Sequence, residues 1–249
     1  MLTSIVIVII LLIILSIYLF RIRSHHERRH HKKTTISSGN ETHIHLTEGV
    51  LNEWLNDKNT YTSLYLSNKH EKKSVLPKNF KLINIDSNAF NQIKTSLSHL
   101  YLDHNLISHI DVDSFIELES LKTLRLDFNR LKSLKLNFAK ENKLENLYLN
   151  NNEIFSIGFD TFSNLKGLLI LDLSFNKLGR ISDYFFNGLT SLKIYCLNNN
   201  EIDEVNMNQL ELVKIRKEEF FVNFKENKLD KKELEKLREY FNIENKKCN

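Results

Sequence analysis

Leucine recurs through the middle of the chain in groups of three, and an asparagine closes each group. The stretch LENLYLNNNEI, residues 144–154, shows the form: Leu, two residues, Leu, one residue, Leu, two residues, Asn, one residue, then Leu or Ile. Five such stretches place their asparagines 24, 23, 24 and 24 residues apart, and a degenerate sixth follows. This regular spacing indicates a repeat architecture. The closing asparagines are Asn105, Asn129, Asn152, Asn176, Asn200 and Asn227.

Each copy predicts one coil of a solenoid. Leucines at alternate positions put their side chains on one face of a short strand, while the residues between them point to the other face. Because a single copy cannot bury its leucines, neighbouring copies are expected to stack with their strands in a parallel sheet. One proline and six glycines are few for so many turns, so the turns depend on another residue type.

The second half of each copy carries its own apolar pattern, in which Phe follows Ile by five positions. The 23-residue copy shortens this spacing to four and starts from Leu. The simplest interpretation is a column of stacked Phe rings on the side opposite the sheet. The pairs are Ile85 and Phe90, Ile110 and Phe115, Leu134 and Phe138, Ile157 and Phe162, and Ile181 and Phe186.

Over about residues 62–242, this pattern resembles the leucine-rich repeat in its 24-residue class. The resemblance implies an α/β repeat solenoid, a curved horseshoe with a concave parallel sheet and its repeats at 97–228. It also implies that the asparagine amides satisfy backbone groups of neighbouring turns, forming a ladder. Proteins of this class are mostly secreted or carried on the cell surface.

An open solenoid needs a cap at each end, because its terminal leucines would otherwise face water. Residues 47–96 are expected to hold an N-terminal capping region with a degenerate repeat, and 47–57 to form a short amphipathic helix. Part of this region resembles the opening of insect leucine-rich immune proteins, although the coiled coil and cysteine cluster of longer members are absent. The residues that carry this resemblance are Leu64, Leu66, Leu76 and Pro77.

Residues 229–249 are expected to form a helical cap at the C-terminal end. Asp230 and Glu233 have the spacing of a helix capping box, and an apolar stripe follows at helical spacing. The layout resembles the C-terminal cap N-x-W-x-C-x-x-L-x-x-L, but Leu229 stands in the Trp place and Lys231 in the Cys place. The stripe consists of Leu234, Leu237 and Phe241.

The first 20 residues are apolar almost throughout, and a helix of about 20 residues spans a bilayer. We expect a single transmembrane helix at 1–20, followed by a basic juxtamembrane segment and tether at 21–46. A removed signal sequence is the alternative, but its charge would normally precede the apolar run. Lys and Arg after the helix favour a cytoplasmic solenoid. Four histidines in this segment are expected to be solvated near anionic head groups, with metal binding as the alternative. They are His25, His26, His30 and His31.

Charge and motifs exclude several classes of function. Residues 1–33 carry six Lys or Arg and one acidic residue, so of the total of +4 the remaining chain carries −1. A near-neutral domain has no basic surface for nucleic acid. No phosphate-binding loop, nucleophile motif or metal-ligand spacing occurs, so no cofactor, metal or enzymatic activity is expected. The one cluster of acid–base groups, His104 with Asp103 and Asp127, is expected to be solvent-exposed.

Candidate ligand-binding residues are large or charged side chains on the strand face opposite the leucines, where the repeat does not require them. Tyr and Arg with aromatic neighbours are typical anchors of protein interfaces. A protein ligand is therefore expected on the concave face, with a glycan as the alternative. The two Phe residues have another interpretation, packing against flanking loops. The candidates are Tyr101, Arg125, Phe128, Tyr148, Asp172 and Phe175.

Together these features predict a non-enzymatic, membrane-anchored binding module that is receptor-like or immune-related. The alternative is a cytoplasm-facing scaffold, favoured by the basic flank and by two cysteines, Cys196 and Cys248, with no evident pairing. The repeat class favours an extracellular or luminal solenoid. A single glycosylation sequon lies at Asn40. The pattern specifies neither the ligand nor the oligomeric state.

Overall fold

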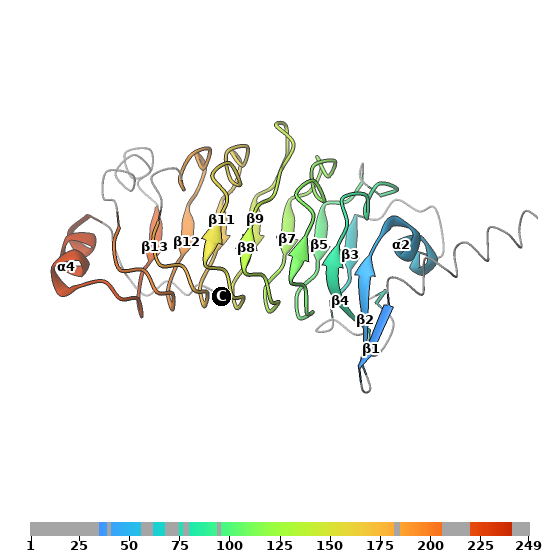
Figure 1. The fold of residues 1–249 in the computed structure, drawn as a ribbon. Helices are drawn as coiled ribbons and strands as arrows, with labels where there is room; N and C mark the ends of the chain where they lie inside the picture. The colour runs from blue at the N-terminus through green and yellow to red at the C-terminus, as the bar shows by residue number, and fades with distance from the viewer. Residues whose placement is uncertain are drawn as a thin grey trace, which may run out of the picture.

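The computed structural model describes residues 35–38, 41–55, 62–67, 75–76, 80–93, 96–181, 185–205 and 220–240, which form an elongated stack of coils (Figure 1). The predicted membrane anchor lies outside these ranges, as do the four clustered histidines, Asn40, Pro77, Phe241 and Cys248. Within the described ranges, no helix is long and apolar enough to cross a membrane.

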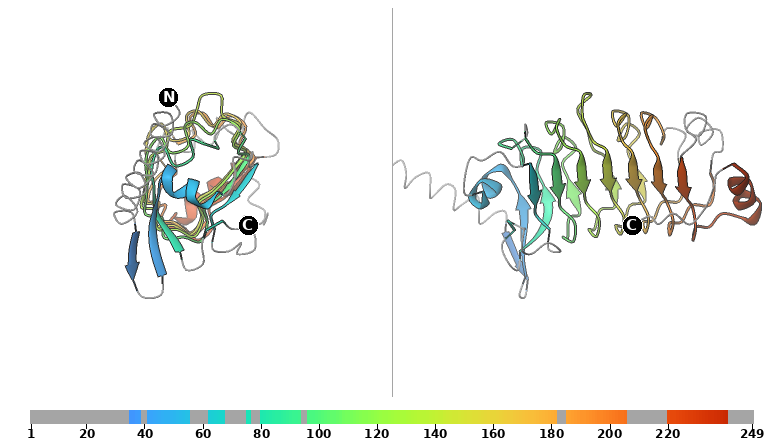
Figure 2. Two further views of the ribbon diagram at one scale, coloured as in Figure 1. Left: turned by 90° about the vertical axis from the view of Figure 1, so that its right-hand side faces the viewer. Right: turned by 180° about the vertical axis from the view of Figure 1, so that it is seen from behind.

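A seven-stranded parallel sheet runs the length of the stack, with one strand from each coil. Viewed along the stack, the coils superimpose and these strands lie on one side (Figure 2). The predicted parallel-sheet solenoid is therefore confirmed. The strands are β3 (Ser63–Tyr65), β5 (His99–Tyr101), β7 (Thr123–Arg125), β9 (Asn146–Tyr148), β11 (Ile170–Asp172), β12 (Ile194–Cys196) and β13 (Phe221–Asn223).

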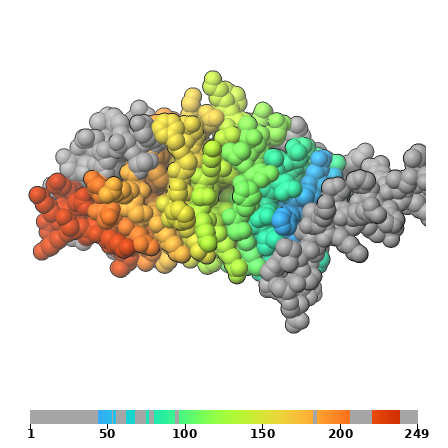
Figure 3. Space-filling model, in the orientation of Figure 1, coloured from blue at the N-terminus to red at the C-terminus, as the bar shows by residue number. Residues whose placement is uncertain are grey.

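The core is built from the leucines that alternate along these strands. Leu100, Leu124 and Leu147 occupy equivalent positions in the sheet and are fully buried. On the opposite side, Phe115 stacks between Phe90 at 6.0 Å and Phe138 at 6.3 Å between ring centroids, which confirms this part of the predicted Phe column. Each coil adds the same apolar layers, so the core is continuous along the stack. The space-filling view shows successive coils packed directly side by side in chain order (Figure 3).

The side opposite the sheet carries turns and short strands in the part of the chain that the structure describes. Three of these strands are β6 (His109–Ile110), β8 (Ser133–Leu134) and β10 (Ser156–Ile157). An α/β repeat would suggest helices here, but the two described helices lie at the ends of the stack (Figure 1). In these coils the Ile and the Phe both face the core and only a few residues separate them. The chain between them is too short to form a regular helix.

The closing asparagines form a hydrogen-bonded ladder between coils. Asn152 Nδ2 donates to the carbonyl oxygens of Leu126 (2.9 Å) and Leu149 (3.0 Å), and its Oδ1 accepts from the Leu131 amide (3.0 Å). One amide thus satisfies backbone groups of its own coil and of the preceding coil, which is how the chain turns with so little Gly and Pro. The equivalent bonds are made by Asn105, Asn129, Asn176, Asn200 and Asn227.

The N-terminal end of the stack is closed by segments expected to belong to a tether. Strand β2 (Glu41–Leu46) pairs parallel with β4 (Phe80–Ile85) and antiparallel with β1 (Thr35–Ser38). The tether prediction is therefore wrong for residues 35–38 and 41–46. Ile44 and Leu46 are fully buried, so two apolar side chains at alternate positions suffice to hold this polar-looking strand on the first coil.

Both predicted terminal helices are present. Helix α2 (Glu48–Trp54) begins after Thr47, whose hydroxyl accepts from the Val50 amide at 3.2 Å. At the other end, α4 (Lys231–Tyr240) begins after Asp230, whose carboxylate accepts from the Glu233 amide at 2.7 Å. Val50, Leu51 and Leu237 are buried against the terminal coils, as caps require. These three side chains are part of the continuous core.

Candidate ligand-binding face

Four side chains from neighbouring strands stack into one column on the outer face of the seven-stranded sheet, the face that was expected to be concave. Tyr65 and Tyr101 lie parallel, with ring centroids 4.3 Å apart. The Arg125 guanidinium lies over the Tyr148 ring, 4.6 Å from its centroid. The sheet register places Tyr65 beside Tyr101, Tyr101 beside Arg125, and Arg125 beside Tyr148. We call these four residues the aromatic column; each is partly exposed.

Arg125 is held rigidly by a buried carboxylate. Its Nε and Nη2 donate to Asp127 Oδ1 and Oδ2, both at 2.9 Å, and the Asp127 side chain is fully buried. Burial alone would lower the pKa of Arg125, but the hydrogen bonds and charge of Asp127 outweigh it and raise this pKa. The bidentate pair orients the guanidinium plane against Tyr148, so the column presents a fixed surface.

Two exposed phenylalanines lie beside the column, where the strands end. Phe128 and Phe175 have φ of 55°, in the left-handed region, and are 43% and 49% exposed. Asn151 and Asn199 hold the same position in other coils, with φ of 56° and 57°. Asn tolerates this conformation far better than Phe. Neither the backbone nor the core explains Phe at this position, since both side chains stay largely exposed, and Phe128 makes a ring contact, a stack on His104 of the preceding coil.

Replacing Phe175 by Asn is expected to leave the unfolding temperature unchanged or raise it, because Asn suits the left-handed backbone and little apolar burial is lost. Thermal unfolding followed by circular dichroism measures this. Phe162→Ala, which removes a buried ring from the core, is the matched comparison and should lower the temperature markedly. A marked fall for Phe175→Asn would instead assign this ring a structural role.

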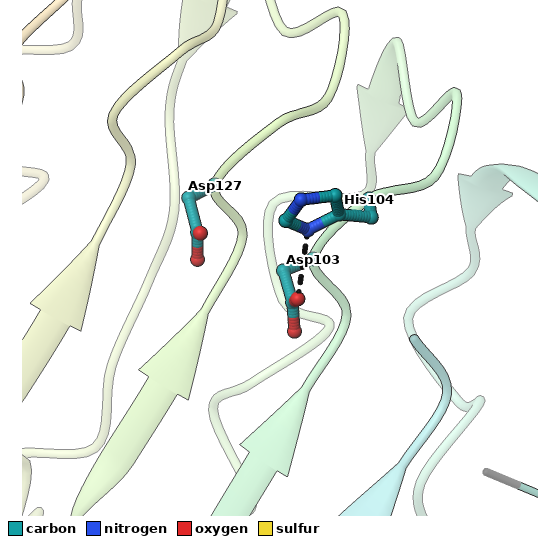
Figure 4. Close-up of side chains that lie close together, drawn as sticks. All are labelled: Asp103, His104 and Asp127. Carbon is teal, nitrogen blue, oxygen red and sulfur yellow. Dashed lines mark hydrogen bonds and ion pairs between the residues drawn. The ribbon is translucent and has the colours of Figure 1, made fainter. Parts of the chain in front are cut away.

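His104, Asp103 and Asp127 do lie together, as Figure 4 shows. His104 Nδ1 is 2.9 Å from Asp103 Oδ2, which also accepts from the Ser67 hydroxyl at 2.9 Å. The imidazole stacks on Phe128, with centroids 4.3 Å apart. Both carboxylates are fully buried, so the cluster is less exposed than we expected.

A potential ligand atom from each residue of this cluster lies within 4.8 Å of the others, which raises the question of a metal ion. The donor set does not fit one. Both oxygens of Asp127 are engaged by Arg125, and a cation there would lie next to a guanidinium. The cluster therefore serves to order the ends of strands β5 and β7.

Several positions expected to face the ligand are instead buried. Asp172 is 1% exposed, and its Oδ1 accepts from the amide and hydroxyl of Ser174 at 3.0 and 2.6 Å. Burial raises the pKa of Asp172. The short polar residues two positions after Tyr101, Arg125, Tyr148 and Asp172, just beyond the strand ends, are buried as well. These buried members are Asp103, Asp127, Asn150 and Ser174.

Sequence reasoning missed Tyr65, the first member of the aromatic column. It precedes Tyr101 by 36 residues, not 24, because the first coil holds an insertion. The signal was the LYLSN stretch at residues 64–68, which has the leucine spacing of a repeat strand. It does not lie one repeat length before the next copy, so a search for regular spacing passes over it.

Cys196 is disulfide-bonded, which corrects the expectation of unpaired cysteines. Its side chain is 1% exposed and lies on the concave side of β12, next to Asp172 in the register. The fifth coil therefore carries a covalent cross-link on the same face as the aromatic column.

The leucine-rich repeat family model matches residues 75–131 and 142–202. The crystal structure of the APL1 leucine-rich repeat domain is 25% identical, with a TM-score of 0.54, over 61% of this chain and 39% of that one. The structure of the Toll–Spatzle complex, a molecular hub in Drosophila development and innate immunity, is 25% identical, with a TM-score of 0.55, over 74% of this chain and 24% of that one.

The chain thus spans less than half the length of either similar structure. No curated protein sequence matches it significantly. The family match covers the coils that are closed by Asn105, Asn129, Asn152, Asn176 and Asn200. The chain is a leucine-rich repeat protein.

Proposed function

We propose that this chain is a non-enzymatic binding module that holds a protein ligand on the N-terminal half of its concave face. The aromatic column forms the centre of the binding surface, and the exposed phenylalanines Phe128 and Phe175 form its edge. Residues 1–20 anchor the module to a membrane. This assignment keeps five of the six candidate residues. Asp172 is left out because its side chain is buried and accepts a hydrogen bond from the Ser174 hydroxyl.

The observation that carries the proposal is the cost of the two exposed phenylalanines. A bulky side chain at positive φ is strained by about 1–3 kcal/mol, and the repeat does not require Phe there, since the same position in other coils holds His104, Asn151, Asn199 or Glu226. Phe128 and Phe175 combine this strain with exposure of nearly half their surface. Beside them, rigid Tyr and Arg side chains offer the amphipathic contacts that dominate protein interfaces.

The disulfide at Cys196 favours the extracellular or luminal form of the proposal over the cytoplasmic scaffold. Disulfides persist in oxidising compartments and are reduced in the cytosol. The similarity to the APL1 domain and to Toll in its complex with Spatzle supports a receptor-like or immune-related role of this kind.

The double variant Tyr101→Ala with Tyr148→Ala is expected to fold normally and to weaken ligand binding by on the order of 30-fold, as for hot-spot residues. For the measurement, the full-length chain carries the photoreactive amino acid benzoylphenylalanine at position 175. It is expressed in cells that also supply the extracellular proteins from which a ligand can bind. Crosslinked species are then compared between the wild-type background and the double variant.

The control carries the same photoreactive residue at position 140, an exposed site outside the concave sheet. The proposal requires a crosslinked protein that forms from position 175, is absent from position 140, and fades in the double variant. Equal crosslinking from both positions, or a yield unaffected by the two tyrosine substitutions, would contradict it.

A further inference from the structure

Two phenylalanines are exposed on the back of the stack, the side opposite the seven-stranded sheet. Phe155 and Phe159 lie on either side of strand β10, and each is 60% exposed. Three residues after the closing asparagine, where this coil has Phe155, other coils have Ser108, Lys132 or Gly179. The repeat therefore does not require an aromatic ring there. Neither ring is part of the buried core, and at this exposure both can contact a partner.

Exposed cations border these rings in the preceding coil. Lys132 and Lys135 are exposed, and no carboxylate among the described residues lies within ion-pair distance of either. The Phe155 amide donates to the Lys132 carbonyl at 3.0 Å, and the Lys135 side chain packs against Gly158. We call the four side chains the basic–aromatic patch; they are Lys132, Lys135, Phe155 and Phe159.

Positive charge on the back of the stack is confined to the three coils around this patch. The stretches 130–136, 153–160 and 177–181 together carry five Lys or Arg and two acidic residues. The equivalent stretches of the coils on either side, 107–113 and 201–205, carry no Lys or Arg and have two and three acidic residues. The patch is thus the centre of a basic band with acidic borders.

This arrangement of charge decides which partner fits. A flat anionic membrane would cover all five stretches, which together hold five basic and seven acidic residues, so it gains no net attraction. A second copy of the chain, related by a two-fold axis through the two rings, would oppose basic coils to basic coils. A short acidic segment of another protein covers the basic band alone. The outer coils of the band are two spacings of about 4.8 Å apart, which about three extended residues span.

The row of short strands on the back of the stack is interrupted beside the patch. Strand β8 pairs with β10 but not with β6, and β8 belongs to the coil that is one residue shorter. A cavity of about 420 Å³ lies between the two coils, with Lys135 in its lining. Two carboxylates in the lining, Asp111 and Asp113, already accept hydrogen bonds from neighbouring side chains. The buried apolar lining, which an apolar ligand group can contact, includes Ile110, Leu131 and Leu134.

We propose that the basic–aromatic patch is a second docking surface, which binds a short acidic segment of a protein partner that also carries apolar side chains. Carboxylates of the segment pair with Lys132 and Lys135. Its apolar side chains pack on Phe155 and Phe159 and enter the cavity. This surface lies on the opposite side of the stack from the aromatic column, so the chain can hold two partners at once.

Selection from a random peptide library tests the surface. The target is the full-length chain in nanodiscs of neutral lipid, and peptides are counter-selected on the variant Phe155→Ser with Phe159→Ser. Peptides that only the parent chain retains are expected to combine Asp or Glu with Leu, Phe or Trp. Finding no such peptides, or finding peptides rich in Lys and Arg, would overturn the proposal.

Charge variants then measure the contribution of the cations. Lys132→Glu with Lys135→Glu is expected to weaken binding of a selected peptide by about tenfold or more, and added salt should weaken it as well. Lys140→Glu with Lys143→Glu makes the same charge change at exposed sites elsewhere in that coil and should retain the parent affinity. Equal losses in both variants would reduce the effect to net charge and overturn the patch.

The other occupants have their own signatures. If anionic nanodisc lipid abolishes peptide binding at constant salt, the bilayer occupies the patch. If the parent chain forms dimers in detergent that Phe155→Ser with Phe159→Ser separates, a second copy occupies it. Either result would overturn the proposal. The double tyrosine variant that tests the proposed function should bind the selected peptide as the parent does, so the two proposals can fail separately.

Discussion

Replacing Asn152 by alanine is expected to lower the free energy of unfolding by about 3–5 kcal/mol. The substitution leaves the carbonyls of Leu126 and Leu149 and the amide of Leu131 without their partner. Each of these groups is buried, and an unsatisfied buried backbone group costs about 1–3 kcal/mol. Denaturant unfolding followed by far-UV circular dichroism measures the loss.

The variant Asn152→Asp separates the hydrogen bonds from the volume of the side chain. It keeps the shape and the acceptor for Leu131, but it turns an oxygen toward the carbonyls of Leu126 and Leu149. We expect a loss at least as large as for alanine at neutral pH. Lys140→Ala, at an exposed site, is the control and should change stability by less than about 0.5 kcal/mol. A near-neutral Asn152→Asp would contradict the ladder's structural role.

Alanine at Gly188 is expected to destabilise the chain by about 3–4 kcal/mol. Gly188 has φ of 87°, which L side chains rarely adopt, so any side chain there is strained. A Cβ at this position would overlap the carbonyl of Ser163 and lie 2.6 Å from the carbonyl oxygen of Phe162. These are backbone atoms of the preceding coil, and they cannot move without separating the two coils. Thermal unfolding at two scan rates measures the effect.

Gly179, earlier in the same coil, provides a matched control. An added Cβ meets nothing within 4 Å, and its φ lies outside the positive range. Gly179→Ala is therefore expected to be neutral or slightly stabilising, because alanine restricts the unfolded chain. If both glycine variants were equally stable, the close approach of the coils at Gly188 would not limit stability.

Coil-to-coil contacts carry these large effects because the molecule is quasi-one-dimensional. Each coil contacts only its neighbours, so one broken interface weakens the connection between the two halves of the stack. Asn152 and Gly188 both lie at such interfaces, whereas Phe175 lies on the open face. This difference explains why changes at the binding face are expected to spare the fold.

The repeat and both terminal helices were predictable because their signals are local. The spacing of three leucines and one asparagine specifies a strand and its end within eleven residues, and Asp230 with Glu233 marks a helix start within four. Strand β2 was missed for the opposite reason. Its residues look polar, and only pairing with β4, far along the chain, buries Ile44 and Leu46.

The candidate binding face was predictable in part. The sequence placed Tyr101, Arg125 and Tyr148 on one side of the sheet, since side chains alternate along a strand. It did not show that Asp127 orients Arg125, that Asp172 is buried, or that Tyr65 extends the column although it lies 36 residues before Tyr101. Those features depend on which side chains meet across coils.

The sequence by itself determined the phase of the coils, the buried leucines and the asparagines between them. Every coil must bury its own leucines and satisfy its own turn, so the same residue types recur at the same positions. The tertiary structure alone decided which polar side chains are buried, how the aromatic column stacks, and that Cys196 is cross-linked. These outcomes depend on contacts between segments distant in sequence, and no local pattern encodes the distance between two side chains on neighbouring coils.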